Sequence, residues 1–405
     1  MVMSSSRPIT GRDWLRRAAG VRRSLAASAF VAALAALFTA GCSGDVSRWL
    51  GDAELVAQGI RLYRLSDSTL LDDGGPISVQ ILRLDPARVE LRSALSQGEV
   101  MGTETVLETA ARAQAVAAIN AGFFLPNGDP TGVLQIDGQL VSDSARPRGA
   151  VAVSRDANKT TLTFDIVTVR ATLKLETAEG PVSVPIAGVD TVRQRGKLML
   201  FTPLYHLHTD TAARGIEWVL DGSPLTVRER RVDAGSTPIP RSGFVLSYGG
   251  LEPPGPLGEL DAGAVVRIER EYVSRHGTPA DLWARATHVI GGAGLLIREG
   301  RAVEGWQDED IRAGFDTERH PRTMIGVDRS GTIWLVTVDG RNPSFSLGMT
   351  FRELQRLASR LELRDALNLD GGGSTTMVVR GQVVNHPSDT AGPRKVSDSI
   401  LVFAR

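Results

Sequence analysis

The sequence predicts an α+β fold, with a strand-rich core of mixed sheets, few helices and an inserted β-rich region. Short runs of alternating apolar and polar residues recur along the chain, a pattern typical of half-buried strands. The chain contains 43 glycines, which favours turns and close backbone approaches over a helical bundle. Apolar residues make up 42% and charged residues 23% of the 405 residues, as in globular domains.

The charge balance bears on the partners of the protein. Lys and Arg number 46 and Asp and Glu number 46, so the formal net charge is zero. Nucleic-acid binding calls for a clearly basic face or stripe, and we therefore expect no nucleic-acid partner. The single cysteine, Cys42, excludes a disulfide framework and any cysteine-based metal site.

The N-terminus has the pattern of an export signal. A basic stretch with Arg16, Arg17, Arg22 and Arg23 precedes an apolar run, 25–40, which ends shortly before Cys42. Small residues before a lone cysteine are typical of a bacterial lipoprotein signal, in which the cysteine is lipidated. We predict a signal at 1–41, a membrane anchor on Cys42, a tether at 42–55 and a location in the cell envelope. An ordinary cleaved signal or a short uncleaved anchor is the alternative.

The main domain is predicted at 56–405, and its elements follow in order. Alternation predicts strands at 60–65 and 77–84, and apolar runs predict strands at 115–119, 323–328, 332–339, 366–370 and 400–403. A helix is expected at 103–113, with Thr103, Glu104 and Thr105 as capping candidates. Thr350 with Glu353 three residues later forms a capping-box pattern for a second helix at 350–361.

The middle of the chain, about 151–285, differs in texture. Strands are expected at 160–169, 171–175, 182–186, 218–220 and 265–268, separated by Gly and Pro turns. No helix is predicted there, and few chemically active residues are concentrated in it. We interpret this stretch as β material inserted into the core.

The most distinctive motif is Asp370-Gly371-Gly372-Gly373-Ser374-Thr375-Thr376, directly after an apolar strand. Three glycines allow a sharp turn whose N–H groups can face an anion, and the hydroxyls add donors. No Lys follows the glycines, so the motif is not a P-loop. A tight structural turn is the alternative interpretation.

Other polar groups also lie at strand ends. Asn120 follows one strand, Asp339-Gly340-Arg341 ends another, and Arg322 precedes a third. A polar loop before the last strand contributes Asn385, Asp389 and Arg394. Groups at strand ends in one domain suggest a shared pocket, in which arginines can bind a phosphate bidentately. Turn chemistry or solvated arginines would explain each group singly.

Metal binding is a minor alternative for these residues. His206 and His208 share a strand face without a third ligand at a suitable spacing, so no zinc site is predicted. We expect no cofactor. A divalent cation such as calcium or magnesium, held by Asp339, Asp370 and Asp398, is the alternative.

Taken together, these residues resemble the phosphodiester glycosidase family, which includes exported bacterial proteins. The resemblance is carried by 119–124, His320-Pro321-Arg322-Thr323, Val338-Asp339-Gly340-Arg341, Asn368-Leu369-Asp370-Gly371-Gly372-Gly373-Ser374, and 385–389 with Arg394. It extends over about 115–403, and the middle β region contributes little to it.

The resemblance implies a hydrolase that cleaves a sugar-1-phosphodiester between the anomeric carbon and the phosphate oxygen. The substrate would be a GlcNAc-1-phosphodiester-like glycan, envelope polymer or exopolysaccharide. Asp370, ahead of Asp339, would be catalytic. The substrate-binding residues would be Asn120, Arg322, Arg341, Asn368, Gly371, Gly372, Gly373, Ser374, Thr375, Asn385, Asp389 and Arg394.

Two other functions fit the same residues. A metal-dependent phosphodiesterase would use the anion pocket but attack phosphorus. A non-catalytic envelope protein would bind phosphorylated glycans without turnover.

Overall fold

The computed structural model describes residues 46–156, 158–177, 179–309 and 311–405. The chain divides into two compact units, Met1–Gly51 and Asp52–Arg405, and the second holds the features described below. The predicted export signal and Cys42 lie outside the described residues. None of the helices in the described ranges is long and apolar enough to cross a membrane.

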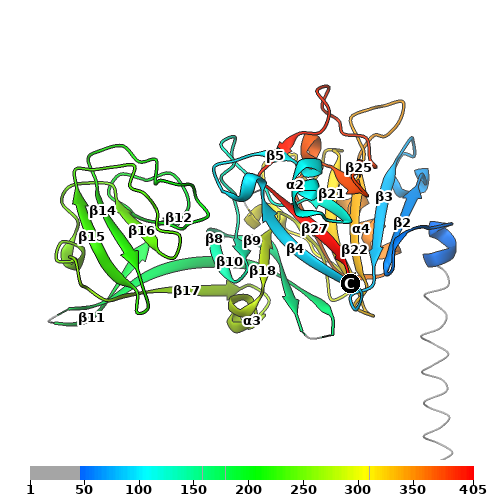
Figure 1. Ribbon diagram of the computed structural model, residues 1–405. Coiled ribbons are helices and arrows are strands. Elements are labelled where there is room, and N and C mark those ends of the chain that lie inside the picture. The colour runs from blue at the N-terminus through cyan, green and yellow to red at the C-terminus, as the bar shows by residue number, and fades with distance from the viewer. Residues whose placement is uncertain (1–45, 157, 178, 310) are drawn as a thin grey trace, which may run out of the picture. The chain divides into compact units, whose positions relative to one another are not determined.

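Strands predominate in the unit Asp52–Arg405, as predicted (Figure 1). The largest sheet has eight strands, each antiparallel to its neighbours. In spatial order they are β1 (Glu54–Ala57), β2 (Ile60–Leu65), β3 (Val79–Leu84), β22 (Ile333–Val338), β21 (Arg322–Asp328), β23 (Leu363–Asn368), β19 (Leu295–Arg298) and β20 (Arg301–Ala302).

A five-stranded antiparallel sheet packs on the same core. Its order is β25 (Gln382–Val383), β24 (Met377–Val379), β6 (Ala117–Asn120), β27 (Asp398–Ala404) and β4 (Val89–Leu95). A small pair, β26 (Lys395–Val396) with β5 (Glu104–Thr105), lies apart from it. Ile119 and Ile400 of this sheet and Ile325 and Leu367 of the larger one belong to one buried apolar cluster, which holds the site-bearing strand ends in place.

A third sheet connects this core to the inserted region. Its order is β11 (Gly180–Ile186), β10 (Thr160–Thr177), β9 (Ser144–Arg155), β18 (His288–Gly291), β7 (Leu134–Ile136) and β8 (Gln139–Ser142), with β17 (Val266–Ser274) paired to β10. Figure 1 shows β10 and β17 side by side as they lead to the remaining strands. Those are β12 (Gly188–Val189), β13 (Leu198–Phe201), β16 (Phe244–Tyr248), β14 (Ile216–Asp221) and β15 (Thr226–Val232).

The inserted region differs from its prediction in three ways. The strands expected at 160–169 and 171–175 are one strand, β10, because neither Gly nor Pro separates them and Arg170 fits the alternation as an exposed residue. A short helix, α3 (Ala280–Arg285), lies where none was predicted, because its six residues are too few to show a helical period. Phe164 and Ile166 belong to the main core, so the insertion begins partway along β10.

The sequence predicts sheets with both parallel and antiparallel pairs, and among the described strands the parallel pairing lies in the inserted region. Among the described strands, β12 and β13 form a parallel pair, and the other pairings are antiparallel. The predicted tether also ends earlier than expected, since β1 begins at Glu54 and pairs with β2.

The two predicted helices are confirmed together with their caps. Helix α2 (Val106–Ala113) begins after Thr105, whose side chain accepts from the Glu108 backbone N–H in a complete capping box. Helix α4 (Phe351–Arg360) begins after Thr350 in the same way, with Glu353 as the reciprocal partner. Single-turn 3-10 helices lie at Ser68–Leu70, Ser96–Gly98, Gly255–Leu257, Trp306–Glu309 and Gly372–Ser374.

Candidate active site

Two strand ends bring two carboxylates to the same short backbone segment. Strand β6 ends at Asn120, and the next residue, Ala121, accepts a hydrogen bond from the Asp370 N–H at 3.0 Å. The Ala121 N–H in turn donates to the carbonyl of Asp398 at 3.2 Å, at the start of β27. Asp370 and Asp398 therefore flank Ala121 from opposite sides.

Asp370 is the partly exposed carboxylate of the pair. Burial raises its pKa to about 6, against the opposing effects of the nearby Ser374 hydroxyl, the Gly371 N–H, Arg394 and Arg148. The Gly371 N–H donates to Asp370 Oδ1 at 2.8 Å. A carboxylate with this pKa is ionised at neutral pH and basic enough to activate water.

Asp398 is buried, with 1% of its surface exposed. The Gly122 N–H donates to its Oδ1 at 3.0 Å, while its Oδ2 has no hydrogen-bond partner in the described part of the chain. Burial and the charge of Asp370 raise the pKa of Asp398 to about 7. Burial thus raises the pKa of both carboxyl groups, and the charge of Asp370 adds to the increase at Asp398.

The glycine turn allows two arginines to approach closely. A Cβ added to Gly372, whose φ is +61°, would lie 2.8 Å from Nη2 of Arg341. A Cβ on Gly373 would collide with Arg394 and Asp389, which form a bidentate ion pair at 2.8 and 3.2 Å. Side chains at these two positions would push the guanidinium groups away. Arg341 and Arg394 are both exposed.

The sequence predicts that the backbone N–H groups of this turn face an anion, but most of them already donate within the protein. The N–H of Gly371 donates to Asp370, that of Gly372 to the Pro321 carbonyl at 2.9 Å, and that of Ser374 to the Gly371 carbonyl at 3.2 Å. The predicted cradle of N–H groups is therefore largely used within the protein, and positive charge around Asp370 comes mainly from arginines.

Arg322 lies deep in the structure, without exposed surface. It donates to the carbonyls of Met349, Phe315 and Glu318 at 2.6 to 2.8 Å, and its guanidinium carbon lies 4.6 Å and 4.8 Å from the ring centroids of Phe315 and Phe351. Burial lowers its pKa to about 9. Only Nη1 has no partner among the described residues, so any contact of Arg322 with a substrate is restricted to that nitrogen.

Asp339 is buried and fully hydrogen-bonded. Its Oδ2 accepts from Ser78 Oγ at 2.8 Å and Gln80 Nε2 at 2.9 Å. Its Oδ1 accepts from Asn385 Nδ2 at 3.1 Å and the His386 N–H at 2.7 Å. With both oxygens occupied, Asp339 is suited to hold the 385–386 segment rather than to act on a reacting atom.

Three asparagines predicted to bind substrate form hydrogen bonds that brace the backbone. Asn120 Nδ2 donates to the Asp370 carbonyl at 2.7 Å, and its Oδ1 accepts from Thr323 Oγ1 and the Thr376 N–H. Asn385 Oδ1 accepts from the Met377 N–H, and its Nδ2 donates to the Thr375 carbonyl. Asn368 donates to the carbonyls of Ala293 and Leu369, and only its Oδ1 lacks a partner in the described ranges.

Unpaired polar atoms gather beside the two carboxylates. Buried hydroxyls without a hydrogen-bond partner among the described residues follow Asp370 in sequence and flank Asp398; they are those of Ser374, Thr375, Thr376, Ser397 and Ser399. Such groups are costly unless water or a ligand satisfies them. Ser374 and Thr375, both predicted to bind substrate, belong to this group.

Two residues of the site were not anticipated in these roles. The sequence indicates Asp398 only as a possible ion ligand. Its position between Ser397 and Ser399 at the start of a buried strand is the sequence feature that could have marked it as a site residue. Arg148, in the middle of β9, has no motif around it, and only the structure places its charge near Asp370, with its guanidinium 5.3 Å from the Phe123 ring centroid.

The alternative of an ion held by Asp339, Asp370 and Asp398 has no geometric support. Throughout the described residues, no three His, Cys, Asp or Glu side chains form a group able to hold a metal ion. The cofactor prediction itself stays a prediction.

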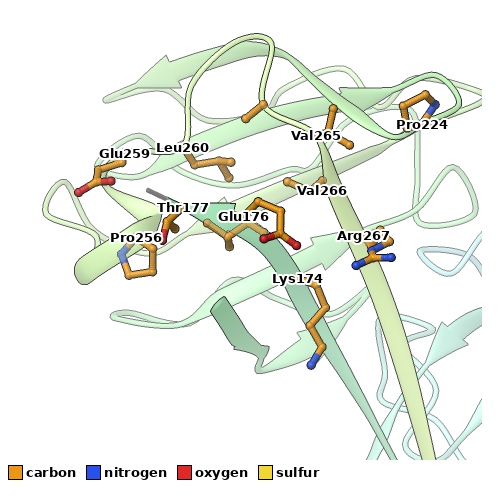
Figure 2. Close-up of a pocket in the computed structure, with 12 residues that line it drawn as sticks. Lys174, Glu176, Thr177, Pro224, Pro256, Glu259, Leu260, Val265, Val266 and Arg267 are labelled. Atoms are coloured by element: carbon orange, nitrogen blue, oxygen red, sulfur yellow. The ribbon is translucent and has the colours of Figure 1, made fainter. Parts of the chain in front are cut away.

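A hollow of about 610 Å³ lies elsewhere, in the inserted region (Figure 2). Leu175, Leu260, Val265 and Val266 line it together with charged side chains of both signs. Lys174, which projects toward its rim, already donates to Ser183 at 2.8 Å. None of the residues of the sequence motifs lines this hollow, so we place the candidate site at Asp370 and Asp398.

The candidate site thus consists of two neighbouring carboxylates, Asp370 and Asp398, with the charges of Arg148 and Arg394 near Asp370. Residues 215–403 match the family model described as phosphodiester glycosidase, and this confirms the resemblance drawn from the sequence motifs. Residues 215–403 are therefore similar to the phosphodiester glycosidase family.

Individual relatives agree with this family. The chain is 28% identical over 142 residues to N-acetylglucosamine-1-phosphodiester alpha-N-acetylglucosaminidase of Bos taurus, covering 33% of this chain and 27% of the relative. The corresponding protein of Homo sapiens is 30% identical over 144 residues, with the same coverage of 33% and 27%. The matches thus span about a quarter of these relatives' length.

Solved structures share the fold. The crystal structure of a hypothetical protein from Synechocystis superposes with a TM-score of 0.71 at 24% identity, covering 86% of this chain and 63% of that one. A putative exported protein from Burkholderia pseudomallei K96243 superposes with a TM-score of 0.68 at 24% identity, covering 82% and 74%. These likenesses support the fold of most of the chain.

Proposed function

We propose that this protein is an exported glycoside hydrolase that cleaves a sugar-1-phosphodiester between the anomeric carbon and the phosphate oxygen. The observation that carries the proposal is the partly exposed Asp370, placed near Arg148 and Arg394 and paired with the buried Asp398. The names of the mammalian relatives, which specify a GlcNAc-1-phosphodiester, support this substrate class.

Phosphate binding is assigned to the exposed arginines. Arg341 packs over Gly372, and Arg394 packs over Gly373, so both guanidinium groups lie at the turn that follows Asp370. A phosphodiester carries one negative charge, which planar guanidinium groups can bind through paired N–H donors. Because Asp389 holds Arg394 in a bidentate ion pair, the arginine is oriented before substrate arrives.

Asp370 is assigned the role of base or nucleophile at the anomeric carbon. A phosphodiester is a good leaving group, so cleavage needs little general-acid assistance. The developing oxocarbenium-like charge is stabilised by the carboxylate of Asp370. Asn120 and Asp339 act as positioning residues, since Asn120 holds the Asp370 carbonyl and Asp339 holds the 385–386 segment.

Hydrolysis in oxygen-18 water tests where the bond breaks. We would incubate residues from Ser43 onward with a GlcNAc-1-phosphate methyl diester and follow the label by mass spectrometry. Label in the sugar supports attack at the anomeric carbon. Label in the phosphate contradicts the proposal and favours the phosphodiesterase, which a chelator such as EDTA would then inhibit. Binding without turnover of this and related diesters would favour the non-catalytic protein.

We also propose that Cys42 is lipidated and anchors the protein in the cell envelope, as the signal-like sequence before it indicates. Metabolic labelling of the full chain with a radioactive fatty acid should label the wild type but not Cys42→Ser. Equal labelling of the two proteins would contradict the anchor and leave the hydrolase proposal untouched.

A further inference from the structure

A second hollow, of about 410 Å³, lies at the end of the large sheet opposite the candidate site. Arg364 lies near the start of β23, whereas Asp370 and the glycine turn follow the end of the same strand. A strand of 6 residues spans about 20 Å, so this hollow is separate from the candidate site. We call it the arginine hollow, and its lining residues are Arg298, Glu299, Arg329, Arg364 and Asp365.

Arg329 belongs to a braced turn, yet it has no partner in the described part of the chain. Asp328 Oδ1 accepts from the N–H and the hydroxyl of Ser330 at 2.9 and 2.6 Å and from the Thr332 N–H at 3.0 Å. Its Oδ2 accepts from Trp334 Nε1 at 3.1 Å. Because both oxygens of the adjacent carboxylate are occupied, the exposed Arg329 makes no hydrogen bond or ion pair with any residue that the structure describes.

The neighbouring loop leaves room for this guanidinium group. Gly300 has a φ of +78°, and a Cβ added there would lie 2.8 Å from Nη2 of Arg329. The Gly300 N–H donates to the Arg364 carbonyl at 2.7 Å, which holds the loop against β23. A side chain at this position would push the guanidinium group away, so the glycine keeps Arg329 at the arginine hollow.

A buried carboxylate orients the other two arginines. Asp365 is 2% exposed; its Oδ2 accepts from Arg364 Nε at 2.7 Å, and its Oδ1 accepts from the Glu299 N–H at 2.9 Å. Nη1 of Arg298 donates to the Phe164 carbonyl at 2.7 Å and lies 3.9 Å from Asp365 Oδ1. The two Nη atoms of Arg364 donate to none of the described residues, so they are available to a ligand.

Positive charge exceeds negative charge among the lining residues. Three guanidinium groups face two carboxylates. Asp365 is already occupied, and the exposed Glu299 is the carboxylate that competes with a ligand for the arginines. Asp165 lies 3.8 Å from Arg298, but it is buried and does not line the arginine hollow. An anion would therefore gain charge-assisted hydrogen bonds here.

We propose that the arginine hollow is a second anion site and that its ligand is a phosphate group. A tetrahedral phosphate presents oxygens in several directions, so guanidinium groups from three segments can each reach one of them. A planar carboxylate has only two oxygens and would use fewer of these donors. The phosphate is either inorganic phosphate or part of a phospholipid headgroup, and the experiment separates these two sources.

Isothermal titration calorimetry at low salt measures the binding of inorganic phosphate to the protein from Ser43 onward, which keeps every described residue. Arg329→Gln should weaken this binding about tenfold, because it removes charge-assisted hydrogen bonds. Glu299→Gln removes the competing carboxylate and should strengthen the binding about threefold. Arg301→Gln is the matched control, because Arg301 is also exposed but does not line the arginine hollow. Arg341→Gln, at the candidate site, should leave the Arg329-dependent binding unchanged.

Flotation with vesicles of phosphatidylglycerol or phosphatidylcholine identifies the source of the phosphate. If the protein binds phosphatidylglycerol vesicles but not inorganic phosphate, and Arg329→Gln loses this binding, the ligand is a lipid headgroup. Arg329-dependent binding of inorganic phosphate without vesicle binding identifies the free anion. The proposal is overturned if the protein binds neither, or if Arg329→Gln and Arg301→Gln change binding equally. Because binding is measured without turnover, these outcomes are independent of the hydrolase proposal.

Discussion

Two buried carboxylates, Glu217 of the inserted region and Asp398 of the main core, have different surroundings. In the inserted region, Glu217 accepts hydrogen bonds from Thr209, Thr211 and Ser247 at 2.7 to 3.2 Å, and Asp190 accepts twice from Thr202 at 2.6 Å. At the end of the main core, Asp398 Oδ2 has no partner among the described residues. Hydrogen bonds offset the cost of burying a carboxylate, whereas an oxygen without a donor leaves that cost uncompensated.

The largest effect is expected at Asp370. Asp370→Asn removes the ionisable group while keeping its size, so kcat should fall at least about a thousandfold. Circular dichroism should show an unchanged fold. The exposed residue Asp261 supplies the control, and Asp261→Asn should retain wild-type turnover. If the turnover of Asp370→Asn stays within tenfold of wild type, the catalytic group is another residue.

The carboxylate pair predicts a bell-shaped pH dependence. Asp370 has a pKa of about 6 and must be ionised, so kcat/KM should fall about tenfold per pH unit below that value. Asp398 has a pKa of about 7, and its ionisation adds a second negative charge that repels an anionic substrate, so kcat/KM should also fall above it. Asp398→Asn should remove only the alkaline limb; if that limb remains unchanged, it belongs to another group.

The saturated carboxylate of the inserted region should matter for stability. Glu217→Ala leaves three hydroxyls without their acceptor and removes the charge 3.8 Å from Arg193, so the free energy of unfolding should fall by about 3 kcal/mol. Urea denaturation measures this loss. Glu229→Ala removes an exposed carboxylate 3.6 Å from Arg231 and should cost less than about 0.5 kcal/mol. Equal losses would show that burial and hydrogen bonding make no difference here.

The unsatisfied carboxylate should behave in the opposite way. The pKa of Asp398 is raised from 3.8 to about 7, so the contribution of this one group to stability is most favourable below pH 4 and declines until the pH passes 7. Asp398→Asn lacks the ionisable group, so its stability should not show this decline. We expect it to gain about 2 kcal/mol over wild type at pH 8 and little at pH 4, as measured by urea denaturation at both pH values. Asp281→Asn, at an exposed position, should show no such pH-dependent gain.

The smallest effect is expected where the two regions meet. Thr191 Oγ1, after β12, donates to Asp129 Oδ2 at 2.6 Å. Asp129 ends a short hairpin in which the Leu125 N–H donates to the Asp129 carbonyl at 2.8 Å, and this hairpin begins at Gly122 beside Asp398. Thr191→Val should raise hydrogen exchange in 122–131 and lower kcat two- to fivefold, about the effect of one hydrogen bond.

Two other variants test the specificity of this contact. Thr191→Ser should restore both values, because it keeps the hydroxyl. Thr226→Val, which removes a hydroxyl bonded only to Pro224, should change neither. If exchange rises in Thr191→Val while kcat stays constant, the hairpin has no part in turnover.

The sequence predicted the strand-rich character of the fold and its two main helices, whereas the location of the site stays a prediction. Capping boxes at Thr105 and Thr350 and the alternating strands depend on local chemistry, which neighbouring residues reveal. Strand ends carrying Asn, Asp and Gly pointed to one pocket, because their polar residues interrupt apolar runs. The continuity of β10 was predictable, since exposed Arg170 continues the alternation between buried Val169 and Ala171 and no Gly or Pro interrupts the run.

The roles of single residues were harder to predict. Asp339 and Asp370 both end apolar strands, yet one is surrounded by donors from Ser78, Gln80, Asn385 and His386, and the other is partly exposed. This difference depends on partners distant in sequence. Arg148 escaped prediction for the same reason, because its charge matters only through the packing of β9 near Asp370.

The 18-residue strand β10 has a consequence for the divergence of this protein. Val167 pairs with Arg148 of β9 on one side and with Ser274 of β17 on the other, at the point where β10 passes from the main core toward the insertion. Substitutions that change the curvature of this strand would shift the position of Arg148 and hence the charge around Asp370. Natural selection could therefore adjust the charge around Asp370, the proposed catalytic carboxylate, through changes in the inserted region without replacing any of the proposed substrate-binding residues.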